Sequence, residues 1–166
     1  MVPAQQRAPR GVPDVRIQRV NTLEELPPTV SREALGAFLH ESLKPYEDPL
    51  PIVLDGIDYA LAGETTCGGG FVLLAPDDDG LLGALVMLNT HMRGYVPENL
   101  LLFVAVSPDS RGRGIGGALV RRAIEECNGD VRLHVEHDNP ARRLYERCGF
   151  VSKYTDMRCT GERDNN

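Results

Sequence analysis

The sequence predicts an α/β fold of the α+β kind, in which a mixed, mostly antiparallel central sheet carries helices on both faces. Three observations support this fold class. Apolar runs suited to strands alternate along the chain with segments of helical periodicity. A tight-turn signal joins two neighbouring strands, which makes that pair antiparallel. A continuously apolar run is followed by a glycine-rich loop and a helix, which is typical of a central strand covered on both faces.

The chain is long enough for one domain but short for two. It has 166 residues, of which 42% are hydrophobic and 25% are charged, as in globular proteins. Residues 1–14 contain three prolines and show little periodicity, so we expect a flexible N-terminal tail there. A single domain at 15–160 and a flexible C-terminal tail at 161–166 complete the expected organisation.

The N-terminal third predicts one strand and two helices. Val15–Val20 alternates between apolar and polar residues and is expected to form the first strand. Ser31–Leu43 has helical periodicity, and its first residue is a good N-cap. Lys44–Pro51 contains three prolines and is expected to be a loop, whereas Ile52–Leu61 predicts a second, weaker helix.

The middle of the chain predicts three strands. Gly70–Ala75 and Leu81–Asn89 flank a Pro-Asp-Asp-Asp-Gly segment that ends in the Asp-Gly pair favoured in hairpins. The three aspartates raise the alternative of a metal site, but the ligand spacing of a calcium loop is missing, so a solvated turn is favoured and no metal is expected. Leu101–Val106 is apolar throughout and predicts the central strand.

The C-terminal third predicts two further helices and two strands. Ile115–Cys127 is an amphipathic helix, and Val131–Glu136 alternates as a strand. Asn139 is expected to cap a short helix that ends at Gly149, and Phe150–Cys159 is expected to form the last strand. The expected element order is therefore β-α-(α)-β-β-β-α-β-α-β.

Charge and composition exclude several classes of partner. The formal net charge is −6, so binding to nucleic acid or to an anionic membrane is not expected. No apolar run reaches the roughly 18 residues of a membrane span, and the first residues lack the apolar core of a secretory signal. The cysteines form no C-x-x-C pair, and Cys127 and Cys148 fall on apolar helix faces. We therefore expect reduced core thiols and a cytoplasmic protein.

The glycine-rich loop predicts a site for a phosphate-bearing ligand. Gly112, Gly114 and Gly117 spell G-x-G-x-x-G, and Glu136 follows at the distance of the ribose-binding acid of a dinucleotide fold. Three observations count against a dinucleotide fold. Ser107–Arg111 separate the strand from the first glycine, and only 30 residues follow Glu136. An upstream hairpin is also out of place in a doubly wound sheet. A turn without a ligand is the other alternative, while a Walker loop lacks its Lys-Ser or Lys-Thr.

Two motifs together resemble the GCN5-related N-acetyltransferase (GNAT) superfamily. Arg111–Gly116 reads R-G-R-G-I-G and matches the R-x-x-G-x-G pattern. Asp138–Phe150 is similar to the D-N-x-x-A-x-x-L-Y-x-x-x-G-F segment, and Val104–Pro108 looks like the family's fourth strand and its exit. The motifs stand in the family's order, separated by a helix and a strand. The resemblance implies the acyl-CoA N-acyltransferase (GNAT) fold and an acetyl-CoA-dependent N-acetyltransferase.

The resemblance also implies how acetyl-CoA would bind as the acyl donor. Its pyrophosphate would lie on the amides of the glycine loop, and its pantetheine arm would pair with the open edge of the fourth strand. The backbone N–H near Val106 would then stabilise the oxyanion of the tetrahedral intermediate. The residues expected to contact the donor are Val104, Ala105, Val106, Arg111, Gly112, Arg113, Gly114, Ile115, Gly116, Gly117, Asn139 and Tyr145.

Tyr145 is the expected general acid. Tyrosine has an ordinary pKa of about 10, against about 8.5 for a thiol, so a neutral tyrosine can protonate the departing thiolate. The alternative is that Tyr145 only belongs to the apolar stripe of its helix. Many family members carry a glutamate as base within the fourth strand, but Leu101, Leu102 and Phe103 stand at the comparable positions here.

The proton acceptor and the acceptor substrate stay open. His134 and Glu98 are the candidate bases, with Glu136 and His91 as further alternatives. The acceptor is expected to be a small-molecule amine or a peptide, attacking directly in a ternary complex, and the protein to be a monomer or homodimer. Acceptor pockets of the family lie in the segments that correspond to 39–67 and 89–98. The missing strand glutamate leaves a catalytically inactive acyl-CoA-binding regulatory module as the alternative function.

Overall fold

The structure, a computed structural model, describes residues 14–64 and 68–161. The expected tails therefore lie outside the described residues, apart from Asp14 and Gly161. The elements, in chain order, are β1 (Gln18–Val20), the 3-10 turn η1 (Leu23–Glu25), α1 (Arg32–Leu43), α2 (Leu50–Ala60), β2 (Gly70–Asp77), β3 (Gly80–Asn89), β4 (Asn99–Val106), the 3-10 turn η2 (Pro108–Ser110), α3 (Ile115–Glu126), β5 (Val131–Leu133) and α4 (Arg142–Arg147).

The five strands of the described residues form one sheet in the order β1-β2-β3-β4-β5. The pairs from β1 to β4 are antiparallel, and β5 joins β4 in parallel. The predicted mixed, mostly antiparallel sheet is thus confirmed. The hairpin between β2 and β3 turns at Asp78 and Asp79, with Asp77 paired to Gly80, so the Asp-Gly turn is confirmed as well.

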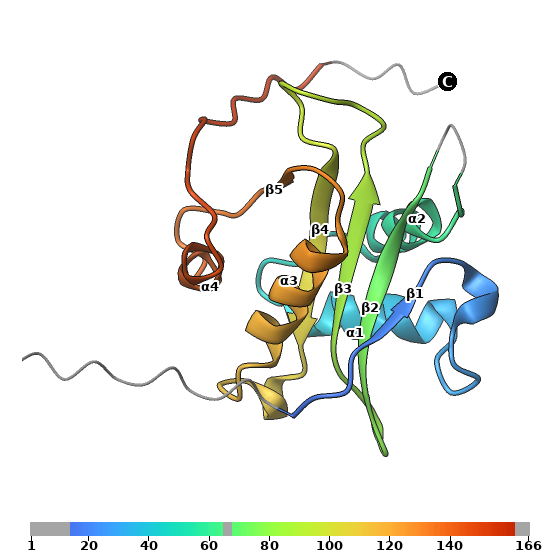
Figure 1. The fold of residues 1–166 in the computed structure, drawn as a ribbon. Helices are drawn as coiled ribbons and strands as arrows, with labels where there is room; N and C mark the ends of the chain where they lie inside the picture. Colours follow the sequence, from blue (N-terminus) through green and yellow to red (C-terminus); the bar gives the residue numbers. More distant parts are fainter. Residues whose placement is uncertain (1–13, 65–67, 162–166) are drawn as a thin grey trace, which may run out of the picture.

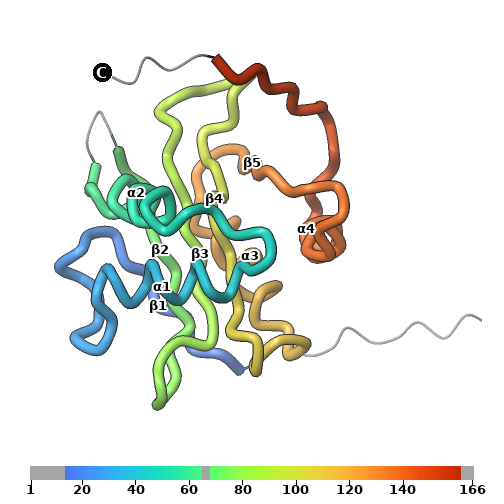
Figure 2. The backbone as a smooth tube through the Cα atoms, turned by 180° about the vertical axis from the view of Figure 1, so that it is seen from behind, coloured from blue at the N-terminus to red at the C-terminus, as the bar shows by residue number. Residues whose placement is uncertain are grey.

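Helices cover both faces of the sheet, as the sequence predicts (Figure 1). α3 lies on one face, and α1 and α2 lie on the other (Figure 2). Two apolar clusters correspond to these faces, because successive strand residues point to opposite sides. Val72 and Leu74 of β2 pack under α1 and α2, while Phe71 and Leu73 pack under α3.

Local chemistry explains where the first two helices begin. The Ser31 hydroxyl accepts a hydrogen bond from the backbone N–H of Ala34 at 3.0 Å, so the predicted N-cap of α1 is confirmed. α2 begins at Leu50, earlier than expected, and includes Pro51. A proline in the first turn costs no hydrogen bond, since that N–H has no partner within a helix. Arg32 and Asp58 form a two-point ion pair that joins the helices, with Nη2 and Oδ2 2.6 Å apart.

Three expectations for the C-terminal third are wrong. β5 ends at Leu133, so His134 follows the strand instead of lying within it. α4 begins at Arg142 after Ala141, because the Asn139 side chain accepts from the N–H of Ala141 and closes a turn ahead of the helix. The last strand at 150–159 is absent. Phe150, Val151 and Tyr154 favour a strand, but a strand is not stable without a partner, and this segment pairs with none of the described strands (Figure 1).

None of the helices in the described part of the chain is long and apolar enough to cross a membrane.

Candidate functional site

The central feature of the site is the separation of β4 from β5. Asn99–Leu101 pair with Val131–Leu133, and beyond this point β4 continues to Val106 without a neighbour on that side among the described strands. A bulge lies at the point of separation: Val86 pairs with Phe103 and Met87 with Leu101, so Leu102 is the additional residue. Bulges bend strands, and an unpaired edge presents backbone N–H and C=O groups to a ligand.

The glycine loop lies at the end of this open edge. β4 leads through η2 into the loop, and α3 begins at Ile115. Gly112 and Gly114 have φ of +76° and +84°, a left-handed conformation that favours glycine. The N–H groups of Ile115, Gly116 and Gly117 belong to the first turn of α3 and have no acceptor within the helix. The loop can therefore hold a phosphate on backbone N–H groups.

Two of the loop glycines also allow close packing. A Cβ on Gly116 would lie 3.3 Å from Cδ2 of Leu144 in α4 and 3.5 Å from Cγ2 of Val106 in β4. A Cβ on Gly117 would lie 3.1 Å from the guanidinium of Arg121. These glycines keep α3 close to α4 and to the open strand edge, which the motif alone does not indicate.

The two loop arginines have different surroundings. Arg113 is exposed and makes no hydrogen bond or ion pair within residues 14–64 and 68–161. The Arg111 guanidinium instead donates from Nη2 to the carbonyl of Ser42 at 2.7 Å, and from Nε to the carbonyl of Val106 at 3.4 Å. Arg113 is thus available to an anion, while Arg111 connects the loop to the end of α1.

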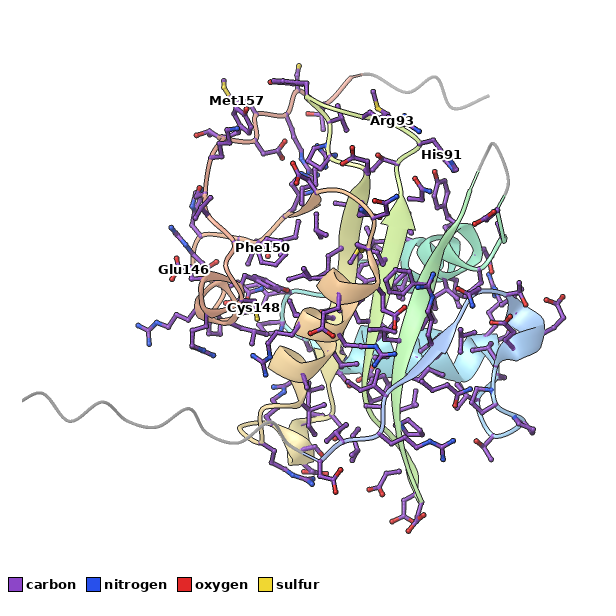
Figure 3. The ribbon with its side chains drawn as sticks, viewed as in Figure 1. His91, Arg93, Glu146, Cys148, Phe150 and Met157 are labelled. Carbon is purple, nitrogen blue, oxygen red and sulfur yellow. The ribbon has the colours of Figure 1, made fainter. Side chains whose placement is uncertain are left out.

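Tyr145 lies on the buried side of α4, with 9% of its surface exposed. Its ring makes an edge contact with Phe150 at a centroid distance of 5.9 Å. Phe150 and Cys148 pack toward α3, whereas Glu146 points away from the sheet (Figure 3). Burial raises the pKa of Tyr145 to about 12, with smaller contributions from Glu136 and Cys148. The phenol therefore stays protonated at neutral pH, as a general acid requires.

The candidate bases differ in their hydrogen-bond partners. The Glu98 carboxylate accepts from the N–H of Asp130 at 2.9 Å, and backbone hydrogen bonds lower its pKa, so it is a weak proton acceptor that supports the turn before β5. His91, in the β3–β4 loop labelled in Figure 3, has Nε2 2.8 Å from the Gly68 carbonyl. His134 is exposed and makes no hydrogen bond within the described part of the chain.

His134 lies directly at the separation of the two strands. Leu133 makes the last pair of β5 with β4, and His134 follows it. Val131, Leu133 and Val135 pack into the cluster beneath α3, whereas Arg132, His134 and Glu136 are exposed. The open edge that the resemblance implies at Val104–Val106 lies in this unpaired part of β4. The residue at which the strands separate differs from the expectation, because β5 ends at Leu133 instead of Glu136.

No group of three or more His, Cys, Asp or Glu side chains in the described ranges could hold a metal ion.

The comparisons with known proteins agree with the fold. A family model described as "Acetyltransferase (GNAT) domain" matches residues 68–152, which is more than half of the chain. The chain belongs to the GNAT family of acetyltransferases. The expected superfamily is thereby confirmed, and the dinucleotide alternative is wrong.

Two curated relatives match over short segments. Cysteine-rich protein 2-binding protein of Mus musculus is 39% identical over 57 residues, which are 34% of this chain and 7% of that protein. Mycothiol acetyltransferase of Corynebacterium aurimucosum is 46% identical over 52 residues, which are 28% of this chain and 17% of that enzyme. The matches thus span less than a fifth of either relative.

A solved structure matches almost the whole chain. The aminoglycoside N-acetyltransferase AAC(6')-Iy in complex with CoA has a TM-score of 0.59 at 14% identity, covering 96% of this chain and 100% of that chain. At this identity the likeness shows the fold, which is the expected GNAT fold.

Proposed function

We propose that the protein is an acetyl-CoA-dependent N-acetyltransferase that transfers acetyl to a primary amine of a small molecule or peptide by direct attack in a ternary complex. The observation that carries this proposal is the open edge of β4 beside the glycine loop. An extended pantetheine arm would pair with the backbone of Val104, Ala105 and Val106. The pyrophosphate would lie on the loop amides, with Arg113 adding a charge-assisted contact and Asn139 contacting the donor from the far side. The CoA bound to the aminoglycoside acetyltransferase of the same fold supports this assignment.

The two faces of the sheet would serve the two substrates. Tyr145 belongs to the cluster beneath α3, on the side of the glycine loop. His134 follows the end of β5, at the point where the two strands separate. The separation of β4 from β5 connects the faces. The acyl group would therefore meet the amine in this opening, between Tyr145 and His134.

The chemical roles follow from these positions. His134, directly or through water, would remove a proton from the ammonium form of the acceptor, because only the neutral amine is nucleophilic. The amine nitrogen would bond to the thioester carbonyl carbon, and the oxyanion would be stabilised by the backbone N–H near Val106. The C–S bond would then break as the Tyr145 hydroxyl protonates the departing thiolate, and the proton that the nitrogen loses would pass through water to the phenolate and restore the phenol. The products would be an N-acetylated amine and CoA.

A CoA-binding regulatory module without transferase activity is the second candidate. It is favoured by Leu101, Leu102 and Phe103, which occupy the part of β4 where many relatives carry a glutamate. Leu101 and Phe103 are buried, so neither the residue types nor their surroundings provide a base. In this case acetyl-CoA would bind without turnover.

The test combines binding and turnover. Calorimetry measures the affinity for acetyl-CoA, and thiol release is followed with a panel of polyamines, amino acids, aminoglycosides and peptide N-termini. Turnover with any amine supports the enzyme, and binding without turnover on the whole panel supports the regulatory module. Gly114→Ala, which places a side chain at a left-handed position in the loop, should weaken acetyl-CoA binding at least about fivefold. If neither acetyl-CoA nor CoA binds, both candidates are wrong.

A further inference from the structure

The contact between Arg111 and Ser42 meets a need of α1. Ser42 is in the last turn of this helix, where the backbone carbonyls receive no hydrogen bond from an N–H group of the same helix. Arg111 donates to the Ser42 carbonyl at 2.7 Å, and Ser42 is buried. A cation is favourable at this end of the helix dipole. The arginine of the glycine-loop motif is therefore turned toward α1 instead of toward the loop amides.

The segment that follows is held at two further points. We call residues 42–48 the α1–α2 strap. The Tyr46 hydroxyl donates to the carbonyl of Asp138 at 3.3 Å, in the turn that precedes α4. His40 Nδ1 lies 2.9 Å from the carbonyl of Asp48, which holds the strap to its own helix. Figure 2 shows the strap passing across β4 toward α4.

The strap is thus bound to both sides of the open β4 edge. Arg111 belongs to the loop assigned to the pyrophosphate, and Asp138 adjoins Asn139, which is also assigned to the donor. The strap itself lies on the face of the sheet that carries α1 and α2, where the acceptor is expected. A ligand that orders the glycine loop and the turn before α4 would therefore restrict the strap as well.

We propose that Arg111 is a positioning residue that couples acetyl-CoA binding to the order of the α1–α2 strap, and that Tyr46 provides the second connection. This inference rests on the proposed function, since it takes the glycine loop as the donor site. Coupling between two sites is reciprocal, so a bound donor would strengthen acceptor binding and a bound acceptor would strengthen donor binding.

Amide hydrogen exchange with CoA as the probe tests the coupling without any knowledge of the acceptor. In the wild-type protein, saturating CoA should slow exchange in peptides that cover 111–117 and also, by at least about fivefold, in peptides that cover 43–49. In Arg111→Ala, protection of the loop should persist while the added protection of the strap is lost. Arg111→Lys keeps one donor and should restore part of it. Arg122→Ala, on the outer face of α3, is the matched control and should behave as the wild type.

Four further results decide the proposal. Arg113→Ala should raise the Kd for CoA by more than Arg111→Ala does, since only Arg113 is free to meet phosphate. The positioning role is wrong if CoA protects the strap of Arg111→Ala as fully as it does in the wild type. That conclusion also holds if the Kd for CoA rises tenfold in this variant while strap protection stays at the wild-type level. If Arg111→Ala does not fold cooperatively, Tyr46→Phe removes the other connection and should halve the protection. Failure of CoA to protect the glycine loop in the wild type would instead refute the proposed donor site.

Discussion

Tyr145→Phe separates the chemical role of the phenol from its packing role. The substitution keeps the ring, its edge contact with Phe150 at 5.9 Å and its place in the cluster beneath α3, and removes only the hydroxyl. If this hydroxyl protonates the thiolate, turnover should fall at least about tenfold, which is about 1.4 kcal/mol in the activation barrier. The Kd for acetyl-CoA should change less than about twofold, because the oxygen is a single atom of a largely backbone-lined site.

The raised pKa of Tyr145 gives the same variant a second, independent readout. Burial raises the pKa to about 12, against about 10 in the unfolded chain. The folded state therefore prefers the neutral phenol. The contribution of this preference to the free energy of unfolding is complete below pH 10 and is lost as the pH rises from 10 toward 12. The full difference amounts to roughly 3 kcal/mol. The wild type should thus lose thermal stability between pH 9 and 11 more steeply than Tyr145→Phe.

The assays are single-turnover and steady-state thiol release, calorimetry with acetyl-CoA, and thermal unfolding at pH 9 and 11. Tyr154→Phe serves as the control for loss of a tyrosine hydroxyl, since Tyr154 is 64% exposed and the substitution keeps its ring contact with Tyr95 at a centroid distance of 5.9 Å. An unchanged rate in Tyr145→Phe would remove the tyrosine from the mechanism, even if its alkaline stability changed as expected. A slower rate together with greatly weakened acetyl-CoA binding would indicate a binding role instead of acid catalysis.

Three further predictions follow from single residues. His134→Gln should lower kcat/KM at pH 7 at least about tenfold without changing the Kd for acetyl-CoA, and an unchanged kcat/KM would return the role of base to water or another side chain. Asn99→Ala should lower the free energy of unfolding, measured in urea, by about 1–3 kcal/mol. Nδ2 of Asn99 donates to the carbonyls of Asn128 and Asp130 and so supports the turn before β5. A loss below about 0.5 kcal/mol would contradict this role. Burial raises the pKa of the Cys127 thiol to about 11, so iodoacetamide at pH 8 should alkylate the exposed Cys159 first. Mass spectrometry of timed samples measures the order of labelling. Equal labelling of both cysteines would be inconsistent with a half-buried Cys127 thiol.

Most of the sheet could be predicted because its signals are local. The apolar runs of β2 and β3, the Asp-Gly turn and the apolar run of β4 each depend on near neighbours in sequence. The last strand was wrongly expected at 150–159 for the same reason. Phe150, Val151 and Tyr154 favour a strand locally, but a strand also needs a hydrogen-bonded partner, and none of the described strands pairs with this segment.

The candidate site divides in the same way. Gly112 and Gly114 could be recognised from spacing, since a left-handed turn before a helix favours glycine at each of them. Tyr145 could be placed on the apolar face of its helix, but the rise of its pKa depends on residues from several elements. The bulge at Leu102 left no signal in the sequence, because a bulge is defined by the register of the neighbouring strand.

The sequence by itself determined the family, the donor class expected for the glycine loop and the identity of the tyrosine. These features are carried by short motifs, whose residue types and spacing can be recognised without the tertiary structure. The tertiary structure alone decided at which residue β4 separates from β5, that His134 follows the end of β5 and that Arg111 donates to the end of α1. Each of these depends on elements distant in sequence that meet only when the sheet and its two helical layers assemble.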